Sequence, residues 1–155
     1  MNINICSIRS KAAPWIDVSI QEYQKRMPKE FNINLIDVPA TKRSKTSNIQ
    51  KIVEIEDANL AKKIPQKSFI VALDQKGKII TTEKFSKNII EWFGFKKSIA
   101  MLIGGRDGLS KNRLDNADYV LSLSRMTFPH AVVKILLVEQ IYRATMMLNN
   151  HPYNR

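Results

Sequence analysis

Residues 98–110, with the sequence SIAMLIGGRDGLS, join a short apolar run to a glycine-rich bend. The run Ser98–Ile103 predicts a strand buried on both faces, as strands of parallel sheets are. The bend contains Gly104, Gly105 and Gly108, three of the five glycines in the chain. Glycines permit a tight turn and a close approach of ligand to backbone. Because ligands bind beyond the carboxyl ends of parallel strands, we expect a binding site here. The alternative is a strand-to-helix turn without a ligand.

Short strands and helices alternate along the rest of the chain. Strands are expected at residues 2–8, 31–36, 68–73, 98–103 and 119–123, and helices at 14–27, 48–63, 81–92, 111–116 and 130–148. Residues 74–78, DQKGK, are expected to form a turn, and Thr81 or Thr82 to cap the helix that follows. This order predicts an α/β fold with a mostly parallel sheet flanked by helices. The length of 155 residues fits a single domain spanning residues 1–155.

Composition narrows the class of protein. The excess of 25 Lys and Arg over 14 Asp and Glu gives a net charge of +11 and favours a polyanionic partner, either nucleic acid or an anionic membrane surface. The single cysteine, Cys6, excludes an intrachain disulfide, and we expect it to be buried in the first strand. Because the chain lacks HExxH and CxxC motifs, no metal site is expected. No apolar run reaches the ~20 residues of a membrane span, and the N-terminus does not resemble a signal peptide. We therefore expect a cytoplasmic protein.

The glycine spacing excludes several common cofactors. GGxxG matches neither the GxGxxG of dinucleotide-binding proteins nor the GxxxxGK[ST] of P-loops, so neither a nicotinamide cofactor nor a nucleoside triphosphate is indicated. The chain also has no nucleophile elbow, and a hydrolytic function finds little support.

Three loops follow the predicted strands at the same edge of the sheet, at residues 73–78, 104–110 and 123–130. In the third, Thr127 is expected to cap the last helix, with Pro129 in its first turn. His130 then lies at the positive end of the helix dipole, which favours a neutral imidazole able to accept a proton or to bond a base edge. A capping or packing role for His130 is the alternative.

Two basic segments are candidates for contact with RNA. Lys42, Arg43 and Lys45 lie in the polar loop of residues 40–47, where they are expected to contact phosphates. The C-terminal sequence NNHPYNR combines His, Tyr and Arg, the residue types that stack on and hydrogen-bond to RNA bases. The alternatives are a solvated surface for the loop and a frayed polar tail for the C-terminus.

The last helix, residues 130–148, is apolar nearly all the way round. A surface helix has a wide polar face, so this helix must be covered on most sides. We expect part of it to be buried against a second copy of the chain, in a homodimer. The alternative is a helix that lies fully inside one chain.

Four motifs together closely resemble the RlmH family: LIGGRDGLS (residues 102–110), LSLSRMTFPH (121–130), EQIYRA (139–144) and NHPYNR (150–155). The resemblance covers the full length of the chain, including the VPATKRSK loop. RlmH proteins are SPOUT-class methyltransferases that use S-adenosyl-L-methionine to methylate N3 of a pseudouridine in large-subunit ribosomal RNA. The resemblance implies a C-terminal trefoil knot, a homodimer, and the assembled ribosome as substrate.

The resemblance also implies the donor site, which the family builds mainly from backbone groups. Carried over by motif, the cofactor-binding residues are Leu73, Gly104, Gly105, Leu123, Ser124, Arg125, Met126, Thr127 and Phe128. Family members often have GGPEG where this chain has GGRDG. Arg106 therefore stands in place of a rigid residue, where it either loosens the turn or adds a phosphate contact. We expect donor binding to survive, because all three glycines remain.

The catalytic candidates are His130, Arg143, Tyr153 and Arg155. His130 would take or relay the N3 proton, either arginine would stabilise negative charge on the ring carbonyls, and Tyr153 would stack on the base. Glu139 is a second candidate acceptor for the proton, unless it pairs with Arg143 one turn away. The rival functions are a SPOUT methyltransferase of transfer RNA or of a ribose hydroxyl, and a ribosome-binding protein without catalysis.

Overall fold

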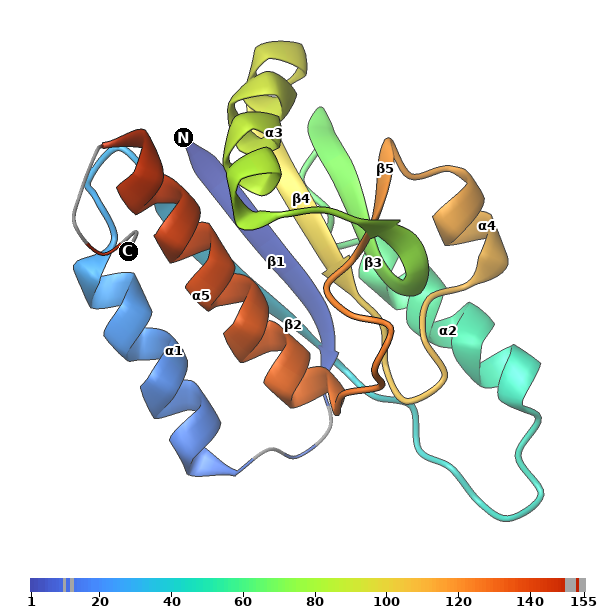
Figure 1. The fold of residues 1–155 in the computed structure, drawn as a ribbon. Helices are drawn as coiled ribbons and strands as arrows, with labels where there is room; N and C mark the ends of the chain where they lie inside the picture. Colours follow the sequence, from blue (N-terminus) through green and yellow to red (C-terminus); the bar gives the residue numbers. More distant parts are fainter. Residues whose placement is uncertain (10, 12, 150–152, 154–155) are drawn as a thin grey trace.

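A computed structural model describes residues 1–9, 11, 13–149 and 153. Its sheet contains β1 (Asn2–Arg9), β2 (Asn32–Pro39), β3 (Ser68–Ile79), β4 (Ser98–Ile103) and β5 (Tyr119–Ser122). The five strands lie in the order β2-β1-β4-β3-β5, and every neighbouring pair is parallel (Figure 1). The predicted α/β fold with a parallel sheet is confirmed.

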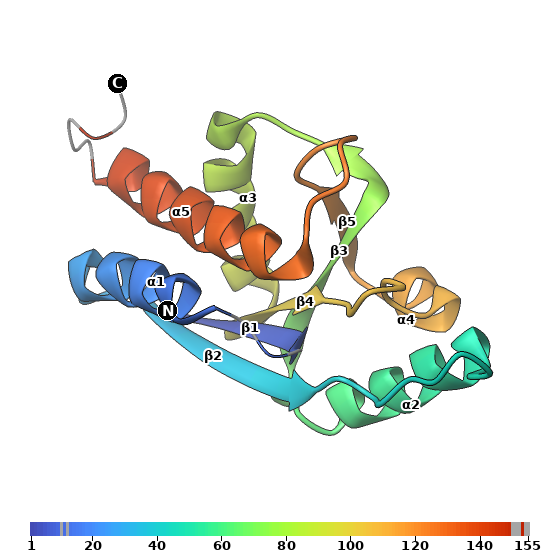
Figure 2. The same ribbon diagram turned by 90° about the horizontal axis from the view of Figure 1, so that it is seen from below.

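Helices cover both faces of this sheet. The helices α1 (Pro14–Arg26), α3 (Thr82–Phe95) and α5 (His130–Leu148) share one face, with α5 between the other two. The opposite face carries α2 (Ile49–Ala61), with α4 (Lys111–Asp115) beside it (Figure 2). Side chains alternate along β1, so that Ile5 packs in the core under α1, α3 and α5, whereas Cys6 packs in the core under α2. Cys6 is fully buried, as expected.

The predicted turn at residues 74–78 is wrong, because β3 continues through this segment to Ile79. The stretch bulges against β5, and Leu121 is the partner of both Leu73 and Lys78. Gly77 permits this close contact, since an added Cβ would lie only 2.7 Å from the carbonyl carbon of Leu121. Pairing with a distant strand therefore overrides the local preference of DQKGK for a turn. The other predicted elements end within about three residues of the observed ones.

Helix α5 is largely enclosed by its own chain. Eight of its residues are buried, among them Leu137, Ile141 and Thr145. Leu136 lies on the outer side and is 36% exposed. The expected cap by Thr127 is wrong, since Pro129 is the N-cap and no side chain bonds there. Thr81, in contrast, caps α3 as predicted, with its Oγ1 accepting from the Lys84 N–H over 3.2 Å. Among the described residues, no helix has the length and apolar character needed to cross a membrane.

Candidate functional site

A cavity of about 550 Å³ opens at the ends of β4 and β5 and beside the bulge in the middle of β3. Its lining comes mainly from the three segments expected to carry the site, of which residues 73–75 belong to β3 and not to a loop. The residues that line it are Leu73, Asp74, Gln75, Ile103, Gly104, Gly105, Arg106, Gly108, Leu121, Leu123, Ser124, Met126, Thr127, Phe128, Pro129, His130 and Val133. The site thus lies at the carboxyl edge of the sheet, where parallel sheets bind their ligands.

Of the nine residues expected to bind the cofactor, Arg125 alone does not line this cavity. Its guanidinium instead donates to the main-chain oxygen of Gln75 on β3. His130, a catalytic candidate, lies on the cavity wall at the start of α5. The structure therefore brings together eight of the nine residues expected to bind the cofactor and one residue expected to be catalytic.

The glycine bend after β4 is built by backbone geometry. Gly108 has a φ of +79°, and its N–H donates to the Gly105 carbonyl over 3.1 Å. A Cβ on Gly104 would clash with the main chain of Gly108 and lie 2.6 Å from the Leu109 nitrogen. Arg106 does not prevent the turn from forming, since the hydrogen bond from Gly108 to Gly105 is present. Arg106 also lines the cavity. A ligand in the cavity can therefore reach main-chain groups without an intervening side chain.

Gln75 on β3 holds the loop of residues 123–130, which forms one wall of the cavity. The sequence did not reveal this role. Gln75 Nε2 donates to Thr127 Oγ1 over 3.2 Å and to the carbonyl of Arg125. Within the same loop, the Met126 N–H donates to Ser124 Oγ over 2.9 Å. These bonds explain why Thr127 does not cap α5. In the sequence Gln75 was one polar residue of an apparent turn, so no signal distinguished it.

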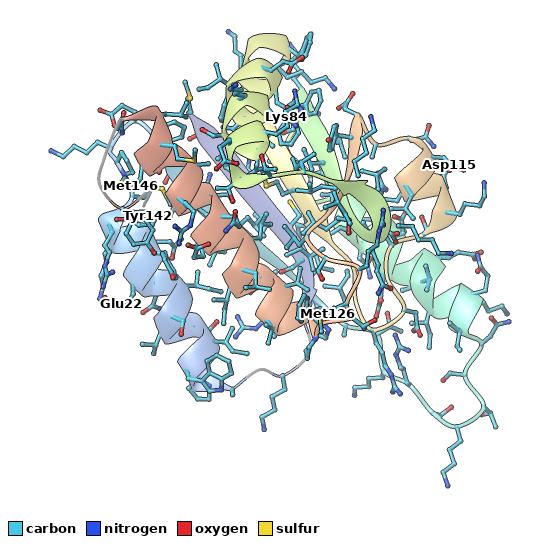
Figure 3. All side chains as sticks on the ribbon, in the orientation of Figure 1. Glu22, Lys84, Asp115, Met126, Tyr142 and Met146 are labelled. Atoms are coloured by element: carbon cyan, nitrogen blue, oxygen red, sulfur yellow. The ribbon has the colours of Figure 1, made fainter. Side chains whose placement is uncertain are left out.

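Two of the remaining catalytic candidates, Arg143 and Tyr153, lie at the other end of α5. Arg143 Nη2 is 2.7 Å from Glu139 Oε1, so the expected Glu139–Arg143 pair is confirmed. The rings of Tyr142 and Tyr153 meet edge to face, with centroids 4.9 Å apart. Figure 3 shows Met126 near the start of α5 and Tyr142 near its far end, beside α1. At 1.5 Å per residue, Arg143 lies about 20 Å along the helix from His130. Arg155 lies outside the described residues.

A partly buried ionic network lies beside His130. Lys134 on α5 pairs with Asp37 on β2, which also accepts from Ser7 Oγ over 2.7 Å and from Arg9 Nη1 over 2.8 Å. Burial acts to raise the pKa of Asp37, but the hydrogen bonds from Lys134, Ser7 and Arg9 outweigh it and hold the pKa below its ordinary value. The network fixes the first turns of α5 to the sheet. Among the described residues, no group of three or more His, Cys, Asp or Glu side chains is arranged to hold a metal ion.

Comparison with known proteins agrees with this geometry. The family model described as "Predicted SPOUT methyltransferase" matches residues 1–154. The chain belongs to the SPOUT methyltransferase family. Among its relatives, the "Ribosomal RNA large subunit methyltransferase H" of Coxiella burnetii is 39% identical over 100% of both chains. The protein of that name from Saccharophagus degradans is also 39% identical over 100% of both chains.

A solved structure supports the same fold. The "probable methylase family protein" from Haemophilus influenzae aligns with a TM-score of 0.57 at 18% identity, covering 96% of this chain and 68% of that one. At this identity the likeness concerns the fold alone. The family model and the curated relatives confirm the resemblance to the RlmH family that the sequence motifs indicate.

Proposed function

We propose that the chain is an S-adenosyl-L-methionine-dependent methyltransferase that modifies N3 of a pseudouridine in large-subunit ribosomal RNA. The observation that carries this proposal is the cavity lined by Gly104 and Gly105 in a chain of the SPOUT family. Relatives that match its full length are named "Ribosomal RNA large subunit methyltransferase H". We infer that residues 1–155 act as one catalytic domain.

The cavity fits the proposed methyl donor in size and lining. Small-molecule sites span about 300–1,000 Å³ and are mainly apolar with a few polar groups. Leu73, Leu121 and Phe128 supply apolar surface, while the main chain of the glycine bend stays accessible. S-adenosyl-L-methionine would supply a methyl group already activated on a sulfonium. The protein therefore has mainly to hold and orient the reacting groups.

The acceptor side needs a proton acceptor and a stabiliser of negative charge. His130 on the cavity wall is our candidate to take or relay the N3 proton. Arg143 or Arg155 would stabilise the charge that develops on the ring carbonyls, and Tyr153 would stack on the base. Glu139 is less suited to accept the proton, because its carboxylate is paired with Arg143.

The distance of about 20 Å between His130 and Arg143 along α5 supports a site shared by two copies of the chain. In a homodimer, the C-terminal segment of one protomer would meet the cavity of its partner. An apolar surface suited to such an interface includes Leu136 on α5 and the exposed Trp15 and Val18 on α1. The trefoil knot implied by the family stays a prediction.

Transfer of labelled methyl groups tests the proposal. Assembled ribosomes, free large subunits and naked RNA are each incubated with the enzyme and labelled donor, and the modified nucleotide is mapped by mass. We expect label at a pseudouridine of the large-subunit RNA, and most of it with assembled ribosomes. Label in transfer RNA or on a ribose would favour the second SPOUT function. Absence of heat on calorimetric titration with the donor would favour a non-catalytic ribosome-binding protein.

A further inference from the structure

Glu56 on α2 is a buried carboxylate with one oxygen left unpaired. The residue is 3% exposed. Its Oε1 accepts from the Thr41 N–H over 2.9 Å, whereas its buried Oε2 has no hydrogen-bond partner among the described residues. An unpaired buried polar atom costs about 1–3 kcal/mol, and more when it is charged. Packing alone therefore gives no reason for a glutamate at this position.

The unpaired oxygen lies directly behind the glycine bend. A Cβ on Gly105 would be 2.8 Å from Glu56 Oε2 and 3.0 Å from Ile8 Cγ2. Gly105 also lines the cavity proposed for the methyl donor. Only the backbone of the bend thus separates the carboxylate from the cavity, and a shift of this backbone changes the surroundings of Oε2.

The other oxygen of Glu56 holds the basic loop, residues 40–47. This loop also contacts the bend directly, because Arg43 forms an ion pair with Asp107. The two side chains of that pair are only 24% and 23% exposed. Figure 1 shows the loop before α2 running beside the connection between β4 and α4. The basic loop and the glycine bend are therefore joined directly by this ion pair, while Glu56 bonds the loop and faces the bend.

The helix that carries Glu56 is itself anchored to the element after the bend. Arg113 on α4 donates from Nε and Nη2 to the two carboxylate oxygens of Asp57, over 2.8 and 3.0 Å. Asp57 follows Glu56 directly in the chain, so α2 supports the bend from beneath and holds α4 beyond it.

We propose that Glu56 is a positioning residue that couples methyl-donor binding at the glycine bend to RNA binding at the basic loop. This inference rests on the proposed function, because it takes S-adenosyl-L-methionine and ribosomal RNA as the two ligands. Glu56 contacts the loop through Oε1 and faces the bend through Oε2, so its position depends on both. Coupling between two binding sites is reciprocal, and each ligand must raise the affinity for the other by the same factor.

The test measures that factor with the full chain, S-adenosylhomocysteine as a non-reacting probe, and purified ribosomes. The Kd for ribosomes is determined without and with saturating S-adenosylhomocysteine, and the Kd for S-adenosylhomocysteine without and with ribosomes. We expect both ratios in the wild type to agree, at about fivefold or more. Glu56→Gln keeps an oxygen for the Thr41 N–H but replaces the oxygen that faces Gly105 by an NH₂ group, and should bring both ratios close to one. Glu54→Gln is the matched control, since Glu54 is exposed on the same helix and bonds only Gln50 in the described contacts.

A wild-type ratio of one, or an unchanged ratio in Glu56→Gln, would overturn the coupling role of Glu56. If Glu56→Gln does not fold, the same two ratios are measured for Asp107→Asn. This variant weakens the ion pair that joins the loop to the bend. An unchanged ratio in that variant would then reject the proposal. Failure of the wild type to bind S-adenosylhomocysteine or to methylate ribosomal RNA is a different result, and would overturn the proposed function itself.

Discussion

The guanidinium carbon of Arg143 lies 4.9 Å from the centre of the Tyr153 ring, over the end of α5 that is remote from the cavity. Arg143 Nη1 also reaches the Tyr153 carbonyl at 3.4 Å. This contact keeps Tyr153 near the last turns of its own helix. If these residues act on a base held at the cavity beside β3, β4 and β5, a second chain must supply them.

Removal of residues 151–155, or Arg155→Ala, should abolish methyl transfer while leaving donor binding nearly unchanged. The cavity proposed for the donor is lined by residues that lie outside the C-terminal segment. Calorimetry with S-adenosylhomocysteine and transfer of labelled methyl groups to ribosomes measure the two properties separately. Full activity in the truncated protein would reject the role of the tail.

Gly104→Ala should weaken donor binding about 10- to 100-fold. The added methyl group meets backbone atoms of Gly108 and Leu109, which cannot rotate away as a side chain can. A loss of this size corresponds to about 1.4–2.8 kcal/mol, which lies within the roughly 1–3 kcal/mol that forcing atoms into a packed site costs. The loss is measured by calorimetry with S-adenosylhomocysteine.

Gly94→Ala is the matched control for Gly104→Ala. A Cβ at Gly94, within α3, would have no atom within 4 Å, so the change should leave donor binding intact. It should also raise the free energy of unfolding by about 0.5–1 kcal/mol, because alanine favours helix over glycine. Equal donor affinities for the two variants would show that the bend does not hold the donor.

The sequence predicted those parts of the molecule that local pattern determines. Ser98–Ile103 and His130–Leu148 have the predicted bounds, because a continuous apolar run between breakers specifies a buried element. The gathering of residues 73–75, 104–108 and 123–130 around one cavity was predictable too, since strand ends at one edge of a parallel sheet converge.

Features that depend on contacts between distant segments could not be predicted. Gly77 looked like a turn residue, yet it allows β3 to lie against the backbone of β5. Thr127 looked like a helix cap, yet its hydroxyl is held by Gln75 from another strand. Glu56 gave no signal at all, because its partner Thr41 and its neighbour Gly105 come from two separate loops.

The Asp37–Lys134 pair makes stability depend on pH in the acid range. The pKa of Asp37 is lower in the folded chain than its ordinary value, so its stabilising contribution is complete above the unfolded pKa of about 4 and is lost as the pH falls through the folded pKa. The free energy of unfolding in urea should therefore decrease below about pH 4. Asp37→Asn should flatten this decrease, and an equally steep decrease in the variant would contradict the assignment to Asp37.

At neutral pH, Asp37→Asn should lower the free energy of unfolding by on the order of 3 kcal/mol, because it leaves the buried Lys134 ammonium without its counter-ion. Lys134→Met should cost less, since Asp37 keeps its bonds to Ser7 and Arg9. Asp17→Asn removes an ion pair whose carboxylate is 43% exposed, and should cost less than about 1 kcal/mol. Urea titration of the three variants at pH 7 gives this order directly, and equal costs for all three would reject it.

A mixture of two variants should recover activity if the site is shared between protomers, provided that the assay uses a donor concentration too low for Gly104→Ala to bind. The chain lacking residues 151–155 keeps its donor cavity, whereas Gly104→Ala keeps its tail. Unfolding and refolding them together at equal amounts produces mixed dimers, each with one intact cavity facing one intact tail. Random pairing predicts up to about a quarter of the wild-type activity per chain, because half of the dimers are mixed and each has one working site. If each tail instead served the cavity of its own chain, the mixture would stay as inactive as either variant alone. Refolded wild-type protein provides the reference for losses during the procedure.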